Sequence, residues 1–435
     1  MKFSSYLAAA AVITGVSASP HPAPQLQQLL GVPSSHSQPS YTQADLDDII
    51  SKSPLLSLHR DLVKIESISG NEHDVGLFVA QYLEARDFTV VKQEVPPVKG
   101  KEDFKTRHNI YAIPKSYKET PSILLTSHID TVPPFIPYSV HQAQTDETTS
   151  LGSENLILAG RGSVDAKASV AAQIVAALQT LDELPEAKLG LLFVVGEEIS
   201  GDGMKIFSDS SLNDKNAFKT IIFGEPTEAA LVAGHKGMLG FKVRAHGNAA
   251  HSGYPWLGAS AVSAILPALS RIDVLGNIPA EEGGLPASSK YGPTTLNIGV
   301  VRAGVATNVV PSEAWADVAV RLAAGTPDEA REIIKRAVAE VTRDFKAEVV
   351  VDFSSRNGSY APQDLDVDVD GFDVITVNYG TDVPNLAVGD GVKRYLYGPG
   401  SIFVAHGDNE ALSVRQLEDA VAGYKKLIVA ALERE

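Results

Sequence analysis

The segment ILLTSHID, residues 123–130, decides the fold because it is an apolar run that ends abruptly in a histidine and an aspartate. Three other runs end in a similar way: LLFVVGEE at 191–198, TIIFGEPTE at 220–228 and SIFVAHGDNE at 401–410. Ligands of an open α/β sheet bind beyond the carboxyl ends of its strands, so four such endings predict one shared site. A purely solubilising role for these polar residues explains any one ending well, but not all four.

The stretches around these runs alternate between helical and extended patterns. NEHDVGLFVAQYLEARDF, residues 71–88, has the apolar spacing of a helix, and TVVKQEV, residues 89–95, is typical of a strand. Helices that alternate with strands predict an α/β fold with a doubly wound, mainly parallel sheet. We expect this main domain to begin near Tyr41.

Residues 237–356 have a different pattern and predict an inserted α+β domain. The expected order is strand, helix, strand, strand, helix, strand, which is that of the split βαβ, or ferredoxin-like, arrangement. The insertion divides the main domain into residues 41–236 and 357–435. Pro267 lies inside the first helix of the insertion and is expected to kink or shorten it.

The second helix of the insertion has clear start signals. Thr326 is the predicted N-cap, Pro327 occupies the first helical position and Glu329 completes a capping box. One apolar stripe then follows at helical spacing.

Residues 1–18 predict a cleaved signal peptide and therefore a secreted, extracellular protein. Lys2 precedes an apolar run at 6–16, and small residues surround Ala18, near which we expect cleavage. A membrane anchor is the alternative, but the run is too short to span a bilayer. Residues 19–40 are rich in Pro, Ser and Gln and predict a flexible lead or a propeptide.

Composition restricts the partners and the metals. With 53 acidic and 37 basic residues, the chain has a formal net charge of −16, which disfavours nucleic acids and anionic membranes as partners. The chain contains no cysteine, so metals that prefer thiolate ligands are excluded. Asn357 begins an Asn-Gly-Ser sequon, which predicts a glycoprotein.

Two histidines are candidate metal ligands. His128 ends the first apolar run, and Asp130 faces the same side of an extended segment. Neutral imidazole binds zinc well and a nearby carboxylate commonly orients the ring, so we interpret His128 as a ligand and Asp130 as its partner. A single His-x-Asp is more often structural. His406, which we expect to end the fourth apolar strand, supplies the second imidazole.

Three carboxylates complete the predicted ligand set. Asp165 lies where a loop enters a helix, so it is either a helix cap or a carboxylate that bridges two cations. Glu197 and Glu198 follow an apolar strand, where two adjacent carboxylates are costly to desolvate unless a cation compensates; a solvated loop pair is the alternative. We assign Glu198 to the metal and Glu197 to general-base catalysis. Glu225 is the third carboxylate ligand, with Glu228 as the alternative.

This set of side chains indicates a particular kind of metal site. Two imidazoles and three carboxylates suit a pair of zinc ions that each keep an open position for water or substrate, and cobalt or manganese also fits. The five predicted ligands are His128, Asp165, Glu198, Glu225 and His406. We expect them to surround a common pair of cations.

The chain resembles the metallopeptidase family that contains aminoacylase, acetylornithine deacetylase, succinyl-diaminopimelate desuccinylase, glutamate carboxypeptidase and vacuolar carboxypeptidase S. The resemblance runs from about residue 50 to the C-terminus. It rests on eight motifs in order: SHIDTVP, GRGSVDAK, GEE, GEPTE, GHKG, AHSGYP, TNVVP and GPGSIFVAHGDNE. Each motif alone is weak evidence, and the ordered set is specific.

The resemblance implies how the metal ligands are shared. One cation takes His128, Asp165 and Glu225, and the other takes Asp165, Glu198 and His406. The chain departs from the family at residues 166 and 168, where alanines replace the usual methionine and glycine after the bridging aspartate. The side chain of methionine and the flexibility of glycine are both lost after that ligand, while the ligand itself is present.

The resemblance also implies roles outside the ligand set. Glu197 is the proton acceptor and Asp130 the partner of His128. Asn308 and Arg321 hold the substrate carboxylate, for which a planar guanidinium is well suited. The inserted domain is then a lid and dimerisation domain of a homodimer, and His251 stabilises the developing oxyanion, reaching in from the partner chain.

These assignments predict a secreted dinuclear zinc hydrolase that cleaves an amide bond next to a free carboxylate. Secretion favours a carboxypeptidase that releases C-terminal amino acids from small peptides. The nearer alternative is an N-acyl-amino-acid deacylase with the same metal chemistry, which the sequence does not separate from a peptidase. The farther alternative is a non-catalytic binding protein on the same scaffold. Retention of all five ligands and Glu197 argues against it.

Overall fold

The computed structural model describes residues 41–100, 104–117, 119–142, 156–354 and 358–434. The predicted signal peptide, the lead to residue 40 and the sequon residue Asn357 lie outside these described residues. Within them, no helix combines the length and the apolarity that crossing a membrane requires.

Six strands form the main sheet, in the order β1-β2-β6-β3-β7-β15. The strands from β6 to β15 run parallel, and β2 pairs antiparallel with both β6 and β1, so β2 alone of the six strands runs in the opposite direction. The predicted α/β fold with a mainly parallel sheet is confirmed. The strand bounds are β1 Phe88–Val95, β2 Arg107–Pro114, β3 Ile123–His128, β6 Leu189–Val194, β7 Thr220–Gly224 and β15 Lys393–Tyr397.

The central strands are apolar throughout because both of their faces are covered. Every residue of β3, β6 and β7 is buried. Leu125 and Leu191 belong to a large core cluster that includes the flanking helices, whereas Leu124 and Leu192 belong to a second cluster. This alternation between two cores explains why the sequence shows continuous apolar runs instead of an every-other-residue pattern.

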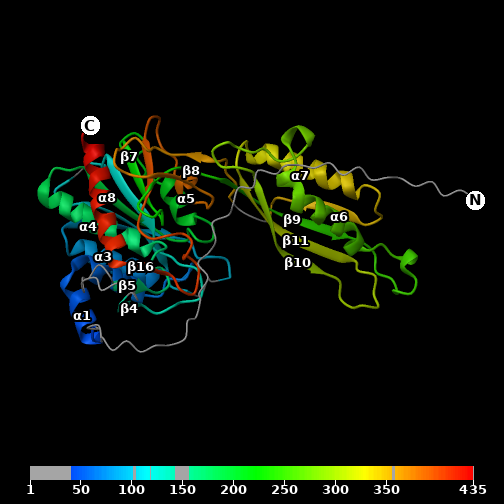
Figure 1. Cartoon of the computed structure of the whole chain (residues 1–435), viewed down its shortest axis with the longest axis horizontal. Helices are drawn as coiled ribbons and strands as arrows, with labels where there is room; N and C mark the ends of the chain where they lie inside the picture. The colour runs from blue at the N-terminus through cyan, green and yellow to red at the C-terminus, as the bar shows by residue number, and fades with distance from the viewer. Residues whose placement is uncertain (1–40, 101–103, 118, 143–155, 355–357, 435) are drawn as a thin grey trace, which may run out of the picture. The chain divides into compact units, whose positions relative to one another are not determined.

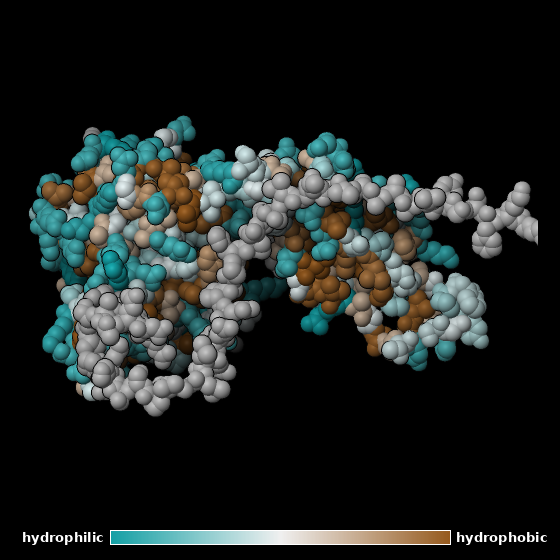
Figure 2. Space-filling view, viewed as in Figure 1, coloured by the Kyte–Doolittle hydropathy of each residue, from teal (hydrophilic) through white to brown (hydrophobic). Residues whose placement is uncertain are grey.

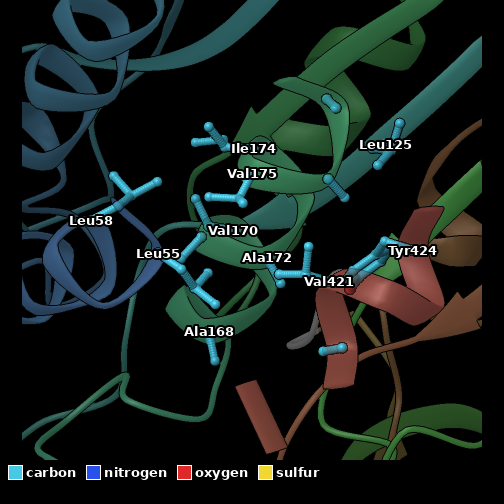
Figure 3. Close-up of a cluster of buried hydrophobic side chains, with 14 of the residues drawn as sticks. Leu55, Leu58, Leu125, Ala168, Val170, Ala172, Ile174, Val175, Val421 and Tyr424 are labelled. Atoms are coloured by element: carbon cyan, nitrogen blue, oxygen red, sulfur yellow. The ribbon is translucent and has the colours of Figure 1, made fainter. Parts of the chain in front are cut away.

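Helix α4 (Lys167–Glu183) is at the centre of the larger core. Its side chains Val170, Ile174 and Val175 lie among those of α2, β3 and α8 in Figure 3, and apolar residues occur on nearly all of its sides. This packing fixes the first turn of α4, and with it Asp165 just before the helix. The remaining helices of the main domain are α1 Gln43–Lys52, α2 Pro54–Lys64, α3 His73–Glu84, α5 Asp202–Ser208 and α8 Val414–Leu432.

His59 on α2 is fully buried, and its Nε2 donates a hydrogen bond to the Ser163 carbonyl at 2.8 Å. Burial lowers the pKa of His59 from 6.5 to about 4. Between these two pKa values the unfolded chain binds a proton at His59 and the folded chain does not. The free energy of unfolding is therefore unaffected by His59 above pH 6.5 and decreases as the pH falls toward 4. The loss amounts to at most about 3 kcal/mol.

We predict that His59→Gln, which keeps a donor for Ser163 but does not titrate, shows a shallower decline of stability in acid than the wild type. Urea unfolding at several pH values between 7 and 4 measures the difference in slope. Parallel curves for the two proteins would show that His59 is not a source of the acid sensitivity.

The inserted domain consists of a four-stranded antiparallel sheet with two helices. Its strand order is β10-β11-β9-β12, and α6 and α7 lie on the same face of the sheet (Figure 1). The order along the chain, βαββαβ, is that of the predicted split βαβ domain. The bounds are β9 Gly237–His246, α6 Ala261–Val274, β10 Thr295–Ala303, β11 Glu313–Leu322, α7 Pro327–Thr342 and β12 Glu348–Asp352.

The two helices of the insertion test two sequence expectations. The capping box of Thr326 and Glu329 at the start of α7 is confirmed. Pro267 was expected to kink or shorten α6; the shortening is wrong, because the helix continues to Val274, and the kink stays a prediction. Apolar packing of the helix on both sides of the proline, including buried Ala264 and Ala268, compensates for the one backbone hydrogen bond that proline removes.

Strand β10 forms one edge of the inserted sheet and is largely exposed. Its Val300 and Val301 are 38% and 53% exposed, and Figure 2 shows apolar areas on the surface of this domain. Exposed apolar residues on an edge strand are a natural site for pairing with another chain.

Two small sheets complete the fold. One has the order β13-β8-β14 and the other β16-β5-β4. Their bounds are β4 Ser139–Gln142, β5 Leu156–Ala159, β8 Leu231–His235, β13 Gln363–Asp364, β14 Val374–Val377 and β16 Ala411–Ser413.

Candidate metal centre

Three neighbouring parallel strands deliver polar side chains to one edge of the main sheet. His128 is the last residue of β3 and pairs in register with Val194, the last residue of β6. Glu197 and Glu198 follow β6 after a turn at Gly196, and Glu225 directly follows β7. Because these strands are adjacent, their carboxyl ends bring the histidine and the glutamates together.

Asp165 and His406 reach the same place from loops. The prediction that residues 401–410 form an apolar strand ending in His406 is wrong: this segment forms turns, and Phe403 is 90% exposed. The strand is β15, which ends at Tyr397 and is followed by Gly398, Pro399 and Gly400. Proline has no N–H to donate to a strand ladder, and Gly400 has a φ of +75°, so the extended backbone does not continue.

The five predicted ligands form two overlapping groups. The ligand atoms of His128, Asp165 and Glu225 lie within 4.8 Å of one another, and so do those of Asp165, Glu198 and His406. Asp165 belongs to both groups, since its Oδ1 lies 3.0 Å from Nε2 of His128 and its Oδ2 lies 3.2 Å from Nε2 of His406. Glu198 Oε2 lies 3.0 Å from Nε2 of His406, and Glu225 Oε2 lies 3.9 Å from Nε2 of His128.

Contacts bear on two of the alternatives that the sequence left open, a capping role for Asp165 and Glu228 in place of Glu225. Ala166, not Asp165, is the N-cap residue of α4, and no side chain caps this helix end. The Asp165 carboxylate is therefore free of a capping role. Glu228 accepts a hydrogen bond from Ser401 Oγ at 2.6 Å and belongs to neither group of ligands.

The site is strongly electronegative. Burial raises the pKa of Glu225 and of Glu197 well above the usual value, and burial together with the Asp165 charge raises the pKa of Glu198 to about 7. Among the described residues, no lysine or arginine forms an ion pair with any of these glutamates.

The carboxylates favour the protonated, positively charged form of the two histidines. Burial opposes protonation of His128, but hydrogen bonds with Asp130 and Asp165 outweigh it and raise the pKa of His128 well above its usual value. Hydrogen bonds with Asp165 and Glu198 raise the pKa of His406 to about 10. Carboxylates without lysine or arginine partners attract positive charge, which either protons on the two histidines or divalent metal ions can supply. The donor set of imidazole and carboxylate is one that divalent metal ions prefer.

Asp130 connects the histidine to the glutamate pair. Nδ1 of His128 lies 3.0 Å from the Asp130 carbonyl and 3.5 Å from its carboxylate, which leaves Nε2 directed at Asp165. The Asp130 carboxylate also accepts hydrogen bonds from the backbone N–H groups of Glu197 and Glu198, at 3.1 and 3.2 Å, and from Ser69 Oγ. These additional contacts, which the sequence did not indicate, hold the glutamate pair against the end of β3.

A cavity of about 580 Å³ opens onto these side chains. Asp165, Glu197, Glu198, Glu225 and His406 line it, together with Arg321 from β11. In the described part of the chain Arg321 forms no ion pair, although the cavity is rich in carboxylates. Tyr360, Tyr379 and Met238 also line the cavity and had no motif that identified them.

His251 and Asn308 are not among the residues that line this cavity. They lie close to each other, because the backbone N–H of Ser252 donates to the Asn308 carbonyl at 3.0 Å. Both are exposed, and Nδ1 of His251 accepts a hydrogen bond from the Gly253 N–H at 3.0 Å. Within one chain, Arg321 therefore shares the cavity with the ligand groups, whereas His251 and Asn308 lie outside it.

The fold and the site together define a class of hydrolase: an α/β domain with clustered histidine and carboxylate ligands, interrupted by a small α+β domain. Residues 233–349 match the M20 peptidase dimerisation domain. A protein of Aspergillus flavus named a probable carboxypeptidase is 63% identical over 422 residues, 96% of each chain. A probable carboxypeptidase of Aspergillus clavatus is 65% identical over 397 residues, 90% of this chain and 85% of that protein.

Solved structures share the fold at lower identity. A tripeptidase from Staphylococcus aureus superposes with a TM-score of 0.66 at 21% identity, covering 87% of this chain and 98% of the other. An M20 family metallo-carboxypeptidase from Sulfolobus solfataricus has a TM-score of 0.61 at 16% identity, covering 87% and 99%. The chain belongs to the M20 family of metallopeptidases and is an enzyme of the peptidase and carboxypeptidase type. The resemblance found in its motifs is confirmed.

Proposed function

We propose that this enzyme is a secreted carboxypeptidase that holds two zinc ions and releases C-terminal amino acids from small peptides. The observation that carries the proposal is the sharing of Asp165 between two groups of three ligands. His128, Asp165 and Glu225 would hold one ion, and Asp165, Glu198 and His406 the other. Two such ions, when bound, would polarise the scissile carbonyl and make a nearby water more acidic.

Glu197 would carry the proton in this reaction. It lines the cavity but is in neither ligand group, and burial raises its pKa well above the usual value. A carboxylate that lines the cavity beside both ligand groups can accept a proton from water and then deliver it to the leaving amine. The hydrogen bond from the Glu197 backbone to Asp130 keeps this side chain at the end of the sheet.

Arg321 would bind the free carboxylate of the substrate. A guanidinium can donate two parallel hydrogen bonds to a carboxylate, and Arg321 has no competing carboxylate within ion-pair distance in the described chain. His251 and Asn308 would complete the site from a second copy of the chain, His251 at the developing oxyanion. Exposed Val300 and Val301 on β10 support such an assembly through the inserted domain.

A direct comparison of substrates tests the activity. Purified enzyme, with and without a chelator, is given a dipeptide with a blocked amino end and an N-acyl amino acid. The proposal expects chelator-sensitive release of the C-terminal residue, with the peptide turned over faster. Faster turnover of the N-acyl amino acid would assign the enzyme to the deacylases instead, and no turnover of either would refute both.

We predict that Arg321→Ala raises KM for substrates with a free carboxylate about 10- to 100-fold, because a charge-assisted bidentate contact is lost. The same change should alter KM much less for the amidated analogues. Steady-state kinetics on matched acid and amide substrates provide the measurement. An equal increase in KM for the acid and the amide substrates would show that Arg321 does not recognise the substrate carboxylate.

Secretion and glycosylation are further parts of the proposal. The charged and apolar pattern of residues 1–18 and the sequon at Asn357 support them. N-terminal sequencing of protein recovered from culture medium tests secretion with signal cleavage. A shift in mass on treatment with an endoglycosidase, absent in Asn357→Gln, tests glycosylation.

A further inference from the structure

A buried ion pair lies directly behind the candidate metal centre. Arg161 and Glu410 are each 1% exposed, and NH1 of Arg161 donates to Oε2 of Glu410 at 2.7 Å. Neither residue belongs to the two ligand groups. Removing two charges from water is costly, so the partners of this pair show what it stabilises.

Glu410 holds the backbone of Asp165. Its Oε1 accepts hydrogen bonds from the N–H groups of Val164 and Asp165, both at 3.0 Å. Its own carbonyl accepts from Ser163 Oγ at 3.0 Å and from the Gly160 N–H at 3.1 Å. The turn that contains Asp165 is thus held by hydrogen bonds to a single residue, Glu410, which lies near the C-terminal end of the sequence.

Arg161 holds the backbone of His406. It donates to the carbonyls of Gly407 at 3.1 Å and His406 at 3.3 Å, and its Nε donates to the Pro134 carbonyl at 3.2 Å. His406 has a φ of +63°, a conformation that side-chain-bearing residues rarely adopt. The contacts from Arg161 therefore fix a backbone that would otherwise have several alternatives.

We infer that Arg161 and Glu410 are positioning residues that lock Asp165 and His406 together as one preformed half of the metal centre. This inference rests on the proposed two-metal function. The effect is asymmetric: the group of Asp165, Glu198 and His406 depends on the pair through two of its ligands, whereas the group of His128, Asp165 and Glu225 depends on it through Asp165 alone. The pair thus sets the affinity of the first group more strongly.

Substituting Glu410→Gln tests the inference. The amide of glutamine has only one oxygen, which can accept hydrogen bonds either from the N–H groups of Val164 and Asp165 or from Arg161. The amide NH₂ would then face the other set of donors, with which it cannot form a hydrogen bond. We expect one cation to bind about 10- to 100-fold more weakly and the other to change less. Titration of the metal-free full-length enzyme with Co²⁺ in the presence of a competing chelator gives both affinities, and the visible spectrum of bound Co²⁺ reports the ligand geometry.

Arg161→Lys is the second variant and keeps the positive charge opposite Glu410. One ammonium cannot reach the carbonyls of Pro134, His406 and Gly407 together, so we expect a loss confined to the weaker cation and a changed Co²⁺ spectrum. Asp317→Asn is the control, since Asp317 and Lys242 form a partly buried ion pair within the inserted sheet and belong to neither ligand group. It should lower thermal stability while leaving both affinities unchanged.

The outcomes are distinct. If both Glu410→Gln and Arg161→Lys bind two Co²⁺ ions with wild-type affinity and spectrum, or if Asp317→Asn matches their losses, the pair is merely structural and the inference fails. If Glu410→Gln does not fold, the result for Arg161→Lys decides alone. A wild-type enzyme that binds no divalent cation would instead overturn the proposed function.

Discussion

Replacing Glu197 with glutamine should lower kcat by about 10²- to 10⁴-fold while the enzyme still binds two metal ions, because general-base catalysis typically contributes a factor of this size. Glutamine keeps the volume of the side chain and its ability to hold a water molecule, but it cannot take the proton. Glu197 lies outside both ligand groups, so the metal content should not fall. Metal analysis and steady-state kinetics on the same preparation measure the two effects together.

Glu228→Gln is the control for this variant. Glu228 is an exposed glutamate near the site, it hydrogen-bonds Ser401, and it belongs to neither ligand group. The same chemical change there should leave kcat and the metal content unchanged. A Glu197→Gln enzyme with near-normal kcat, or one that has lost a metal, would assign Glu197 a role other than proton transfer.

The parts of the site that the sequence predicted are those that follow directly from sheet topology. His128, Glu198 and Glu225 come directly after apolar runs, and parallel strands that lie side by side must end at the same edge. The residue types then indicated a metal. β1 and β2 lie outside the run of β6, β3 and β7, so the expected fold class was sufficient to bring the three side chains together.

The sequence did not predict which element presents His406 or which residues support the ligands, because these features depend on loops and on contacts between distant residues. His406 was expected at a strand end, but Gly398, Pro399 and Gly400 stop the strand early and a loop presents the histidine instead. The hydrogen bonds between Glu410 and the turn before α4 join residues 245 and 246 positions apart. No local pattern encodes such a pairing, since each residue on its own appears as an ordinary charged residue of a loop.

Replacing Asp165 with asparagine should disable both cation sites at once, because this is the one residue in both ligand groups of the described chain. Asparagine offers a single neutral oxygen, so it cannot bridge two cations with two charged oxygens. We expect metal binding at both sites to weaken and activity to fall by roughly 10³-fold or more, since a metal supplies several kcal/mol to the transition state and 1.36 kcal/mol is a factor of ten.

Glu225→Gln provides the informative contrast, because Glu225 belongs to one group only. Glu225→Gln should weaken the binding of one cation and leave the affinity for the other near that of the wild type, whereas Asp165→Asn should weaken the binding of both. Asp408→Asn, on the exposed loop beside His406, tests whether the loss of any nearby carboxylate has the same result, and it should retain two metals. Isothermal titration of the three metal-free proteins with Zn²⁺ distinguishes these patterns. An Asp165→Asn enzyme that loses only one ion would show that the two groups do not share this carboxylate, and the two-metal arrangement would have to be abandoned.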